Sequence, residues 1–446
     1  MLEKAQKMLE KHPLCNNCLG RQFALLGYGV DNEKRGEALK LLLTMKAHQL
    51  ALLKEKTGFT LLETLASNGN FQIAMEIFRQ MKNKPTIAKP CYLCNGRFDL
   101  LKGLLDLAVD KLKDYECNNL LVGIELPIQI EEREDEFKGE FMVEYGESMR
   151  NEFSRSLGKK IAEATGKEIE YARPEVVVLA NPFTEQVTLQ INPLFIEGRY
   201  TKLVRGIPQS RWFCRSCKGK GCPKCNWTGK MYQESVEEIV GNPALEITQG
   251  ENMAFHGAGR EDIDARMLGL GRPFVIEVKK PKKRFINLRR LQKIVNERAA
   301  GRVQVSNLCF ADKEVVRRLK KSEAAEKLYR VVIEVDKPVS NKQLTIMQKS
   351  FAGALVRQQT PRRVIHRRAD LTREKYIYKT KVKRLTPNSF EMRIRCQGGL
   401  YIKELVTGDE GRTVPSVTEI LSIKAVPIEL DVLGVYTEEE KVSEKI

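Results

Sequence analysis

The chain has 446 residues, enough for two or three domains that each bury a core of their own. Hydrophobic residues make up 42% and charged residues 30% of it, which is typical of a globular protein and excludes a disordered or membrane-embedded one. The net charge is +18, and residues 201–446 carry the whole excess, with 49 Lys and Arg against 29 Asp and Glu. A basic half of this size favours a polyanionic partner, nucleic acid first.

The N-terminal segment 1–14 has no apolar core followed by a small-residue cleavage site, so we expect no signal peptide. The apolar stretch 39–53 is interrupted by Lys40, Lys46 and His48, which predicts an amphipathic helix rather than a membrane span. The eleven cysteines fall mostly in CxxC pairs, which favour metal sites over disulfides in an intracellular protein. We therefore expect a cytoplasmic protein with no membrane partner.

Residues 1–95 have apolar positions at helical spacing in 33–56 and 71–81, and predict a mainly helical domain. Two CxxC pairs bracket these helices: Cys15, Cys18, Cys91 and Cys94. A CxxC turn points two thiolates at one tetrahedral metal, so a second pair completes a zinc site with four cysteine ligands. The helices must fold back to unite the pairs; the alternative is four independent thiols.

Residues 96–200 change to an α/β pattern. The expected helices are 98–112 and 146–165, and the expected strands are 120–126, 175–180 and 186–191. The acidic run 131–136 predicts a solvated loop. With its closing segment Phe195-Ile196-Glu197-Gly198-Arg199-Tyr200, this region resembles a THUMP domain, which implies an RNA-binding module of tRNA-modifying enzymes.

A second cysteine cluster occupies 214–229, where two CxxC pairs are each followed by a glycine-containing turn. The cysteines of these pairs are Cys214, Cys217, Cys222 and Cys225. Their spacing indicates two knuckles around one zinc ion, which would be structural because four thiolates leave no open position for water. Basic residues threaded through the cluster could contact phosphate.

Residues 231–446 alternate helices and strands, and predict a mixed, largely antiparallel sheet. The expected helices are 234–247, 287–300 and 400–406. The expected strands are 274–278, 329–335, 376–384 and 390–396. The predicted fold class is thus α/β (α+β), with three domains: 1–95, 96–200 and 201–446, the last with the cysteine insertion at 214–225.

The segment FHGAGREDIDARMLGLGRPFVIE, residues 255–277, sets two aspartates and three arginines among four glycines. Glycines let the backbone approach a ligand closely. A carboxylate beside guanidinium groups stays ionised, which suits a nucleophile or a base. The segment predicts a tight loop that presents an acid to an anionic substrate; the alternative is a surface turn with solvated ion pairs.

Within this segment, Arg260-Glu261-Asp262 resembles the Arg-x-Asp element of pseudouridine synthases. The longer string GREDIDARMLGLGRPFVIE is similar, almost residue for residue, to the tRNA pseudouridine-54/55 synthase family of archaea and eukaryotes. The resemblance implies that Asp262 is the catalytic nucleophile and that Arg260 contacts the substrate. It further implies isomerisation of uridine to pseudouridine in the tRNA T-loop, at position 54, 55 or both, without a metal or organic cofactor in the chemistry.

Two further segments match this family. Tyr329 aligns with the tyrosine that stacks on the target uracil, although a half-buried strand tyrosine is the commoner case. The segment Cys396–Leu405 resembles the strand–glycine–helix segment of synthases that act on tRNA uridine 55. By that resemblance Tyr401 lines the base pocket, Lys403 pairs with the catalytic Asp and Leu405 packs below. The alternative is an ordinary amphipathic helix with Lys403 in solvent.

The segment 357–370 is also similar to the family, and is too basic and too interrupted by proline for a core element. It predicts a loop that contacts the phosphate backbone of tRNA. The arginines expected to bind phosphate are Arg362, Arg363, Arg367 and Arg368.

Two rival functions are weighed against this interpretation. A THUMP-bearing methyltransferase or thiolation enzyme would need a nucleotide-binding glycine loop, and the sequence has neither GxGxxG after a strand nor a P-loop. A non-catalytic, zinc-containing tRNA-binding adaptor would explain the charge and the cysteines. It would not explain Asp262, Tyr329 and Lys403 together.

Overall fold

The structure is a computed structural model that describes residues 1–321 and 325–436. The chain forms two compact units, Met1–Asn192 and Pro193–Ile446, and each is described by itself. Within the described ranges, every helix is too short or too polar to span a lipid bilayer.

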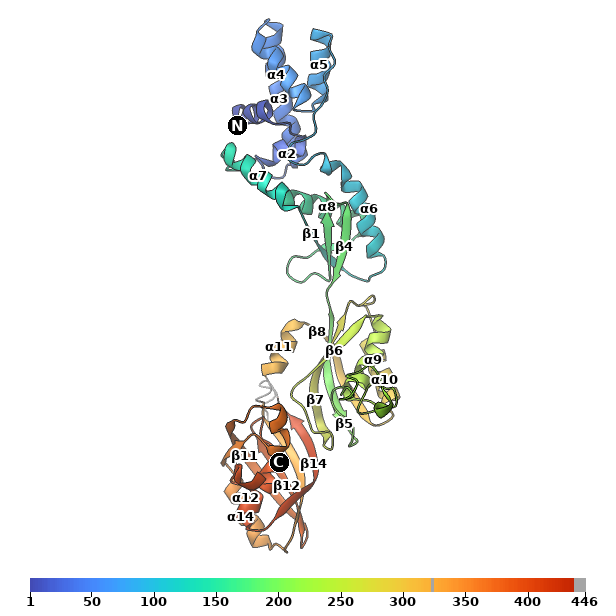
Figure 1. Cartoon of the computed structure of the whole chain (residues 1–446), viewed down its shortest axis with the longest axis vertical. Coiled ribbons are helices and arrows are strands. Elements are labelled where there is room, and N and C mark those ends of the chain that lie inside the picture. Colours follow the sequence, from blue (N-terminus) through green and yellow to red (C-terminus); the bar gives the residue numbers. More distant parts are fainter. Residues whose placement is uncertain (322–324, 437–446) are drawn as a thin grey trace. The chain divides into compact units, whose positions relative to one another are not determined.

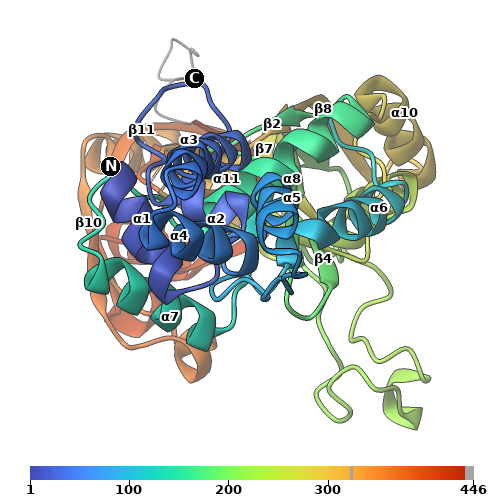
Figure 2. The same cartoon turned by 90° about the horizontal axis from the view of Figure 1, so that it is seen from above.

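The first unit combines a group of helices with a small sheet. Its helices are α1 (Leu2–Lys11), α2 (Asn16–Arg21), α3 (Asn32–Leu52), α4 (Lys56–Ser67), α5 (Gln72–Lys82), α6 (Leu101–Leu112), α7 (Ile128–Glu140) and α8 (Met149–Thr165). Its strands, in the order β2-β1-β3-β4, are β1 (Asn119–Ile124), β2 (Glu168–Ile169), β3 (Val176–Asn181) and β4 (Gln186–Ile191). Helices α3, α4 and α5 pack against one another, and α6 and α8 pack on the sheet (Figures 1 and 2).

Local sequence explains these elements. The Ser148 side chain accepts a hydrogen bond from the backbone N–H of Asn151 at 3.2 Å, which starts α8, and Gly166 ends it in the left-handed conformation at φ 68°. In β3, Val176 and Val178 are buried and Val177 and Leu179 are less so. This period of two matches a strand with one face on the core.

The acidic run 131–136 forms part of α7, so the prediction of a solvated loop is wrong. The reason is a buried partner that the sequence pattern could not show. Glu134 accepts a hydrogen bond from Arg21 Nε at 3.0 Å, and both side chains are buried. The remaining acids of the run lie on the outer side of the helix, where charge is compatible with water.

The second unit is built on a ten-stranded mixed sheet. In spatial order its main path is β13-β10-β11-β12-β9-β14-β7-β5-β8, and β6 pairs with β7. The strands are β5 (Leu194–Lys202), β6 (Asn252–Gly257), β7 (Arg266–Lys279), β8 (Val303–Ala311), β9 (Lys327–Val335), β10 (Leu355–Gln359), β11 (Thr372–Thr386), β12 (Ser389–Cys396), β13 (Thr413–Val414) and β14 (Ala425–Val435). The β14–β7 pair is parallel and the neighbours of both strands are antiparallel, which confirms the predicted mixed, largely antiparallel sheet.

The helices of the second unit cover this sheet. They are α9 (Val236–Thr248), α10 (Leu288–Ala299), α11 (Lys313–Lys321), α12 (Asn341–Phe351), α13 (Ile402–Thr407) and α14 (Val417–Leu421). Helices α9 and α10 lie beside β6 and β8, whereas α12 packs on β11 and α13 on β14 (Figure 1). The apolar core is correspondingly divided into two clusters, and Tyr329 packs against both.

The boundary between the two units falls between Asn192 and Pro193 of the chain. The predicted boundary between the second and third domains falls at residue 200. The segment 195–200, assigned from sequence to the THUMP-like region, lies in β5 of the second sheet. There Tyr200 is paired with Arg272 of β7. The predicted α/β (α+β) fold class is confirmed, while the three domain ranges stay predictions.

The parallel pair of β7 and β14 joins the part of the second unit that holds one apolar cluster to the part that holds the other. Arg266 and Met267 of β7 are paired with Asp431 and Val432 of β14. Val432 is paired in turn with Tyr329 of β9. The loop 258–265, which carries the predicted nucleophile, leads directly into this contact and is therefore brought next to β9.

Candidate active site and cysteine clusters

The loop 258–265 joins β6 to β7 and depends on a glycine. Gly259 has φ +79°, and a Cβ added there would lie 3.1 Å from Lys327 Nζ and 3.2 Å from Arg272 Nη1. Its N–H donates to Gly257 O at 2.9 Å. The backbone conformation therefore favours glycine, and a side chain at this position would crowd two cationic groups.

A buried ion pair lies beneath this loop. Arg272 Nε donates to Glu261 Oε2 at 2.8 Å, and the Arg272 side chain is only 1% exposed. The Tyr200 hydroxyl lies 2.9 and 3.0 Å from the two Glu261 oxygens, and Gln209 Nε2 donates to Tyr200 Oη at 2.8 Å and to Gly259 O at 2.9 Å. Burial, and then the Glu261 charge, raise the pKa of Tyr200, so its phenol stays protonated and donates. Glu261 thus turns into the core.

Lys202, on β5, is a second buried cation under the loop. Its ammonium lies within hydrogen-bond distance of three carbonyl oxygens, at 2.8 Å from Ile207 O and 3.2 Å from both Asp262 O and Ile263 O. Three donors meet three acceptors. Burial lowers the pKa of Lys202 to about 8, while the nearby Glu261 acts in the opposite direction. The backbone of Asp262 is therefore held from below while its side chain faces outward.

The Asp262 carboxylate lies between two cations from distant segments. Arg363 Nη2 is 3.3 Å and Lys403 Nζ is 3.4 Å from Asp262 Oδ2. Arg363 also contacts Glu404 through Nε at 2.6 Å, which orients the guanidinium. The Asp262 side chain remains 33% exposed, so it is accessible to a ligand.

Lys403 is closer to Asp264 than to Asp262. The Lys403 Nζ to Asp264 Oδ2 distance is 2.7 Å, and the Asp264 side chain is 67% exposed. Burial opposes ionisation of Asp264, but the hydrogen bond from Lys403 prevails and lowers the pKa of this carboxyl. The lysine therefore bridges two carboxylates, one half enclosed and the other open to solvent.

The predicted base-binding residues lie around a cavity of about 400 Å³ that Asp262 also lines. Tyr329 of β9, Tyr401 at the start of α13 and Arg260 line it as well. Burial raises the pKa of Tyr329, so its ring is neutral. Leu405 is fully buried in the apolar core and does not line the cavity. The structure brings Tyr329, Tyr401 and Arg260 together with Asp262.

The arginines of 357–370 differ in their surroundings. Arg362 pairs with Glu410. Arg363 contacts Asp262, a contact that the sequence did not suggest. Arg368 is exposed and lines the same cavity as Asp262. The side chain of Arg367 lies outside the part of the chain that the structure describes. Their predicted role in phosphate binding stays a prediction.

Several site residues escaped the sequence analysis. Glu404 lies beside Lys403 in the family-like segment, so adjacency was an available signal. Tyr200 likewise lies in a family-like segment, at the end of Phe195–Tyr200. Lys202 and Gln209 gave no signal, because an isolated lysine or glutamine normally lies in solvent.

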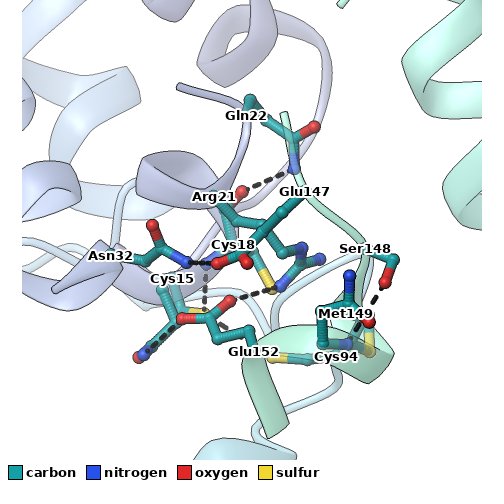
Figure 3. Close-up of polar contacts among 12 residues, drawn as sticks. Cys15, Cys18, Arg21, Gln22, Asn32, Cys94, Glu147, Ser148, Met149 and Glu152 are labelled. Carbon is teal, nitrogen blue, oxygen red and sulfur yellow. Dashed lines mark hydrogen bonds and ion pairs between the residues drawn. The ribbon is translucent and has the colours of Figure 1, made fainter. Parts of the chain in front are cut away.

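The first four cysteines converge in the first unit, and Figure 3 labels three of them, Cys15, Cys18 and Cys94. Their sulfur atoms lie within 4.8 Å of one another, and Cys15 Sγ is 3.5 Å from Cys94 Sγ. Zinc–sulfur bonds of about 2.3 Å in a tetrahedron place the sulfurs about 3.8 Å apart. Arg21 Nη1 donates to Cys18 Sγ at 3.5 Å, and the same nitrogen lies 3.0 Å from Glu152 Oε2. The four thiols could hold a metal ion.

The second four cysteines also converge. Sγ–Sγ distances are 3.9 Å for Cys214–Cys222, 3.8 Å for Cys217–Cys225 and 3.7 Å for Cys222–Cys225. Backbone N–H groups of Cys222 and Gly229 donate to Cys225 Sγ at 3.3 and 3.2 Å, as expected for a sulfur that carries negative charge. This cluster too could hold a metal ion.

Comparisons with known proteins give consistent results. The family model described as "Pus10, C-terminal" matches residues 195–436, and the one described as "Pus10 THUMP domain, archaeal" matches residues 104–181. A Methanocaldococcus jannaschii protein named "tRNA pseudouridine synthase Pus10" is 44% identical over 96% of this chain and 93% of its own length. Proteins of the same name are 40% identical in Methanothrix thermoacetophila (98% and 94%) and 37% in Pyrococcus furiosus (99% and 99%).

Among solved structures, that of a Cbf5-Nop10-Gar1 complex is similar over 53% of this chain and 47% of that chain. The sequence identity is 15% and the TM-score is 0.29. Similarity at this level has no bearing on function.

We predict that Glu261→Gln lowers the free energy of unfolding of the second unit by about 3–5 kcal/mol, because it leaves the buried Arg272 charge uncompensated. The measurement is guanidinium unfolding followed by tryptophan fluorescence, since both tryptophans, Trp212 and Trp227, lie in this unit. The control is Glu251→Gln, which removes an exposed pair with Lys280 and should cost less than about 1 kcal/mol. Equal costs for the two variants would refute the importance of the buried pair.

Proposed function

Because this chain belongs to the Pus10 family, we propose that it is a tRNA pseudouridine synthase that converts uridine to pseudouridine in the T-loop, at position 54, 55 or both. Family membership follows from relatives at 37–44% identity that align over nearly the whole chain. The choice of the T-loop follows from the similarity of 259–277 and 396–405 to the synthases that act there.

Asp262 is the proposed nucleophile. Pseudouridine formation breaks the N1–C1′ bond, turns the uracil over, joins C5 to C1′, releases the C5 proton and leaves a proton on N1. The Asp262 carboxylate would form the transient bond to the substrate, with Arg363 and Lys403 holding it in position. The single observation that carries this proposal is that Asp262 and Tyr329 line one cavity.

The other cavity residues would bind the base and its backbone. A uracil taken out of the RNA stack needs a flat apolar surface, which the neutral Tyr329 ring offers, with Tyr401 completing the cavity wall. Arg260 and Arg368 line the cavity and would contact phosphate. The reaction is an isomerisation, so atoms balance without a metal or organic cofactor.

We propose that both cysteine clusters hold structural zinc. Four thiolates with sulfur separations of 3.5–3.9 Å match a tetrahedral zinc site and leave no position for substrate. The zinc would therefore stabilise the fold and would take no part in the reaction. The THUMP-like part of the first unit would bind tRNA. As an enzyme that acts on tRNA, the protein would be located in the cytoplasm.

The first test uses unmodified tRNA transcript labelled with tritium at uridine C5. We expect the wild-type protein to release tritium without added cofactor, and Asp262→Ala to lose at least about a thousandfold in rate while binding tRNA normally. Asp264→Ala, which removes the neighbouring exposed carboxylate, should change the rate less than about tenfold. Tight binding without release by the wild-type protein would instead indicate a non-catalytic adaptor.

We also predict that the rate of tritium release depends on pH through Lys202. Below about pH 8 Lys202 carries its proton and can donate to all three carbonyl oxygens; as the pH rises through 8 it loses one donor. We therefore expect the rate of tritium release to fall above about pH 8. Lys202→Met should be slower at pH 7 and should lack this decline. A decline of the same size in Lys202→Met would assign it to another group, such as the uracil itself.

The third prediction is metal content. We expect two zinc ions per wild-type chain, one in Cys94→Ala, one in Cys222→Ala and none in the double variant, by elemental analysis of purified protein. Cys117→Ala is the matched control, because Cys117 is buried and lies outside both clusters. Two ions retained in Cys222→Ala would contradict the second zinc site.

A further inference from the structure

A second cavity of about 490 Å³ adjoins the one that Tyr329 lines. Asp262, Arg260 and Tyr401 line both cavities, so the two meet at the proposed nucleophile. Trp212 lines only the second cavity, and Tyr329 lines only the first. A nucleotide bound at Asp262 in the first cavity would therefore leave the second cavity open to its neighbour in the RNA chain.

Trp212 and Arg260 form a stacked pair in the wall of this second cavity. The Arg260 guanidinium carbon is 5.0 Å from the centroid of the Trp212 ring. Tyr232 contacts the indole edge-on, with ring centroids 5.7 Å apart and an interplanar angle of 83°. Such planar groups are the surfaces on which proteins stack unpaired bases.

Backbone contacts at the base of the cysteine insertion hold Trp212. Trp212 O accepts from Met231 N at 2.9 Å, and Phe213 forms a β-bridge with Lys230. These contacts close the neck of the 214–225 insertion, two residues before Cys214. Trp212 thereby connects the insertion to the second cavity. Zinc binding alone does not explain this connection.

The charges around the second cavity suit the backbone of a nucleotide. Arg260, Arg363, Arg368 and Lys403 line it. Three acids line it too, and each has a cationic partner: Glu261 pairs with the buried Arg272, whereas Asp262 and Asp264 contact Arg363 and Lys403. With Arg272 included, the cations outnumber these acids. A polyanion with a flat base fits this combination of cations and indole better than a small apolar ligand does.

We propose that Trp212, stacked with Arg260, is a binding subsite for the base adjacent to the uridine that Asp262 attacks. Extrusion of the uridine breaks its stacking with its neighbours, and this pair replaces one of the lost stacking partners. The subsite rests on the proposed function, since it takes Asp262 as the point of attack.

The test first locates the modified uridine by tritium release from transcripts labelled at one position. Dissociation constants are then measured for wild-type protein, Trp212→Ala and Trp212→Phe, with intact tRNA and with tRNA that has an abasic residue on either side of that uridine. We expect Trp212→Ala to weaken binding of intact tRNA about tenfold, and Trp212→Phe to weaken it much less. At one of the two abasic positions, wild-type protein and Trp212→Ala should bind equally.

Equal weakening by Trp212→Ala on intact RNA and on both abasic RNAs would overturn the proposal, because Trp212 would then only support the cavity wall. The matched control is Trp227→Phe, which changes the other tryptophan; Trp227 is 73% exposed and outside both cavity linings. It should bind and release tritium like the wild-type protein. It also leaves Trp212 as the single tryptophan, whose fluorescence intact tRNA should quench and the informative abasic tRNA should not.

Failure of the subsite and failure of the proposed function give different results. Tritium release by the wild-type protein with no base-dependent effect of Trp212→Ala refutes the subsite alone. Absence of tritium release refutes the proposed function and, with it, the subsite as defined here. Zinc content and melting temperature of Trp212→Ala that match the wild type ensure that a loss of binding is not a loss of fold.

Discussion

The buried ion pair between Glu261 and Arg272 determines the geometry of the candidate active site. In a loop, the side chains of neighbouring residues cannot all point into the protein, so some of them face the solvent. Because Glu261 is held inward by Arg272 and Tyr200, the next residue, Asp262, must face outward. Lys202 fixes the same short stretch by its carbonyl oxygens. The loop therefore presents its carboxylate through constraints that lie below it, and these leave the cavity above free for a ligand.

Sequence patterns predicted the parts of the molecule whose structure is decided locally. The strands around Val331 and Phe390 and the helix that begins at Leu288 show clear apolar periodicity and occur as predicted. Strand β14 was missed, because Pro427 interrupts its pattern and irregular pairing surrounds that residue. Pairing across the sheet is set by contacts between distant segments, which no local pattern encodes.

The same distinction applies to the site. The loop with Asp262 and the segment with Tyr401 and Lys403 were recognisable as strings of sequence, and the structure places both at one cavity. The burial of Lys202 could not be predicted, since two of its carbonyl partners lie about sixty residues further along the chain and reach it only in the folded state. Arg363 was assigned to phosphate from the basic character of its segment, and its contact with Asp262 depends on tertiary structure.

Asp431 has a consequence for the order in which the contacts of the site can form while the chain is being synthesised. This fully buried carboxylate of β14 accepts hydrogen bonds from Arg205, Arg266 and Arg330, which come from three separate segments. Arg266 lies four residues beyond Asp262. During synthesis on the ribosome the three arginines emerge before Asp431, so their contacts with this carboxylate can form only once β14 has been made. The candidate active-site loop can thus acquire its last contacts only late in translation, after Arg363, Tyr401 and Lys403 have also been made.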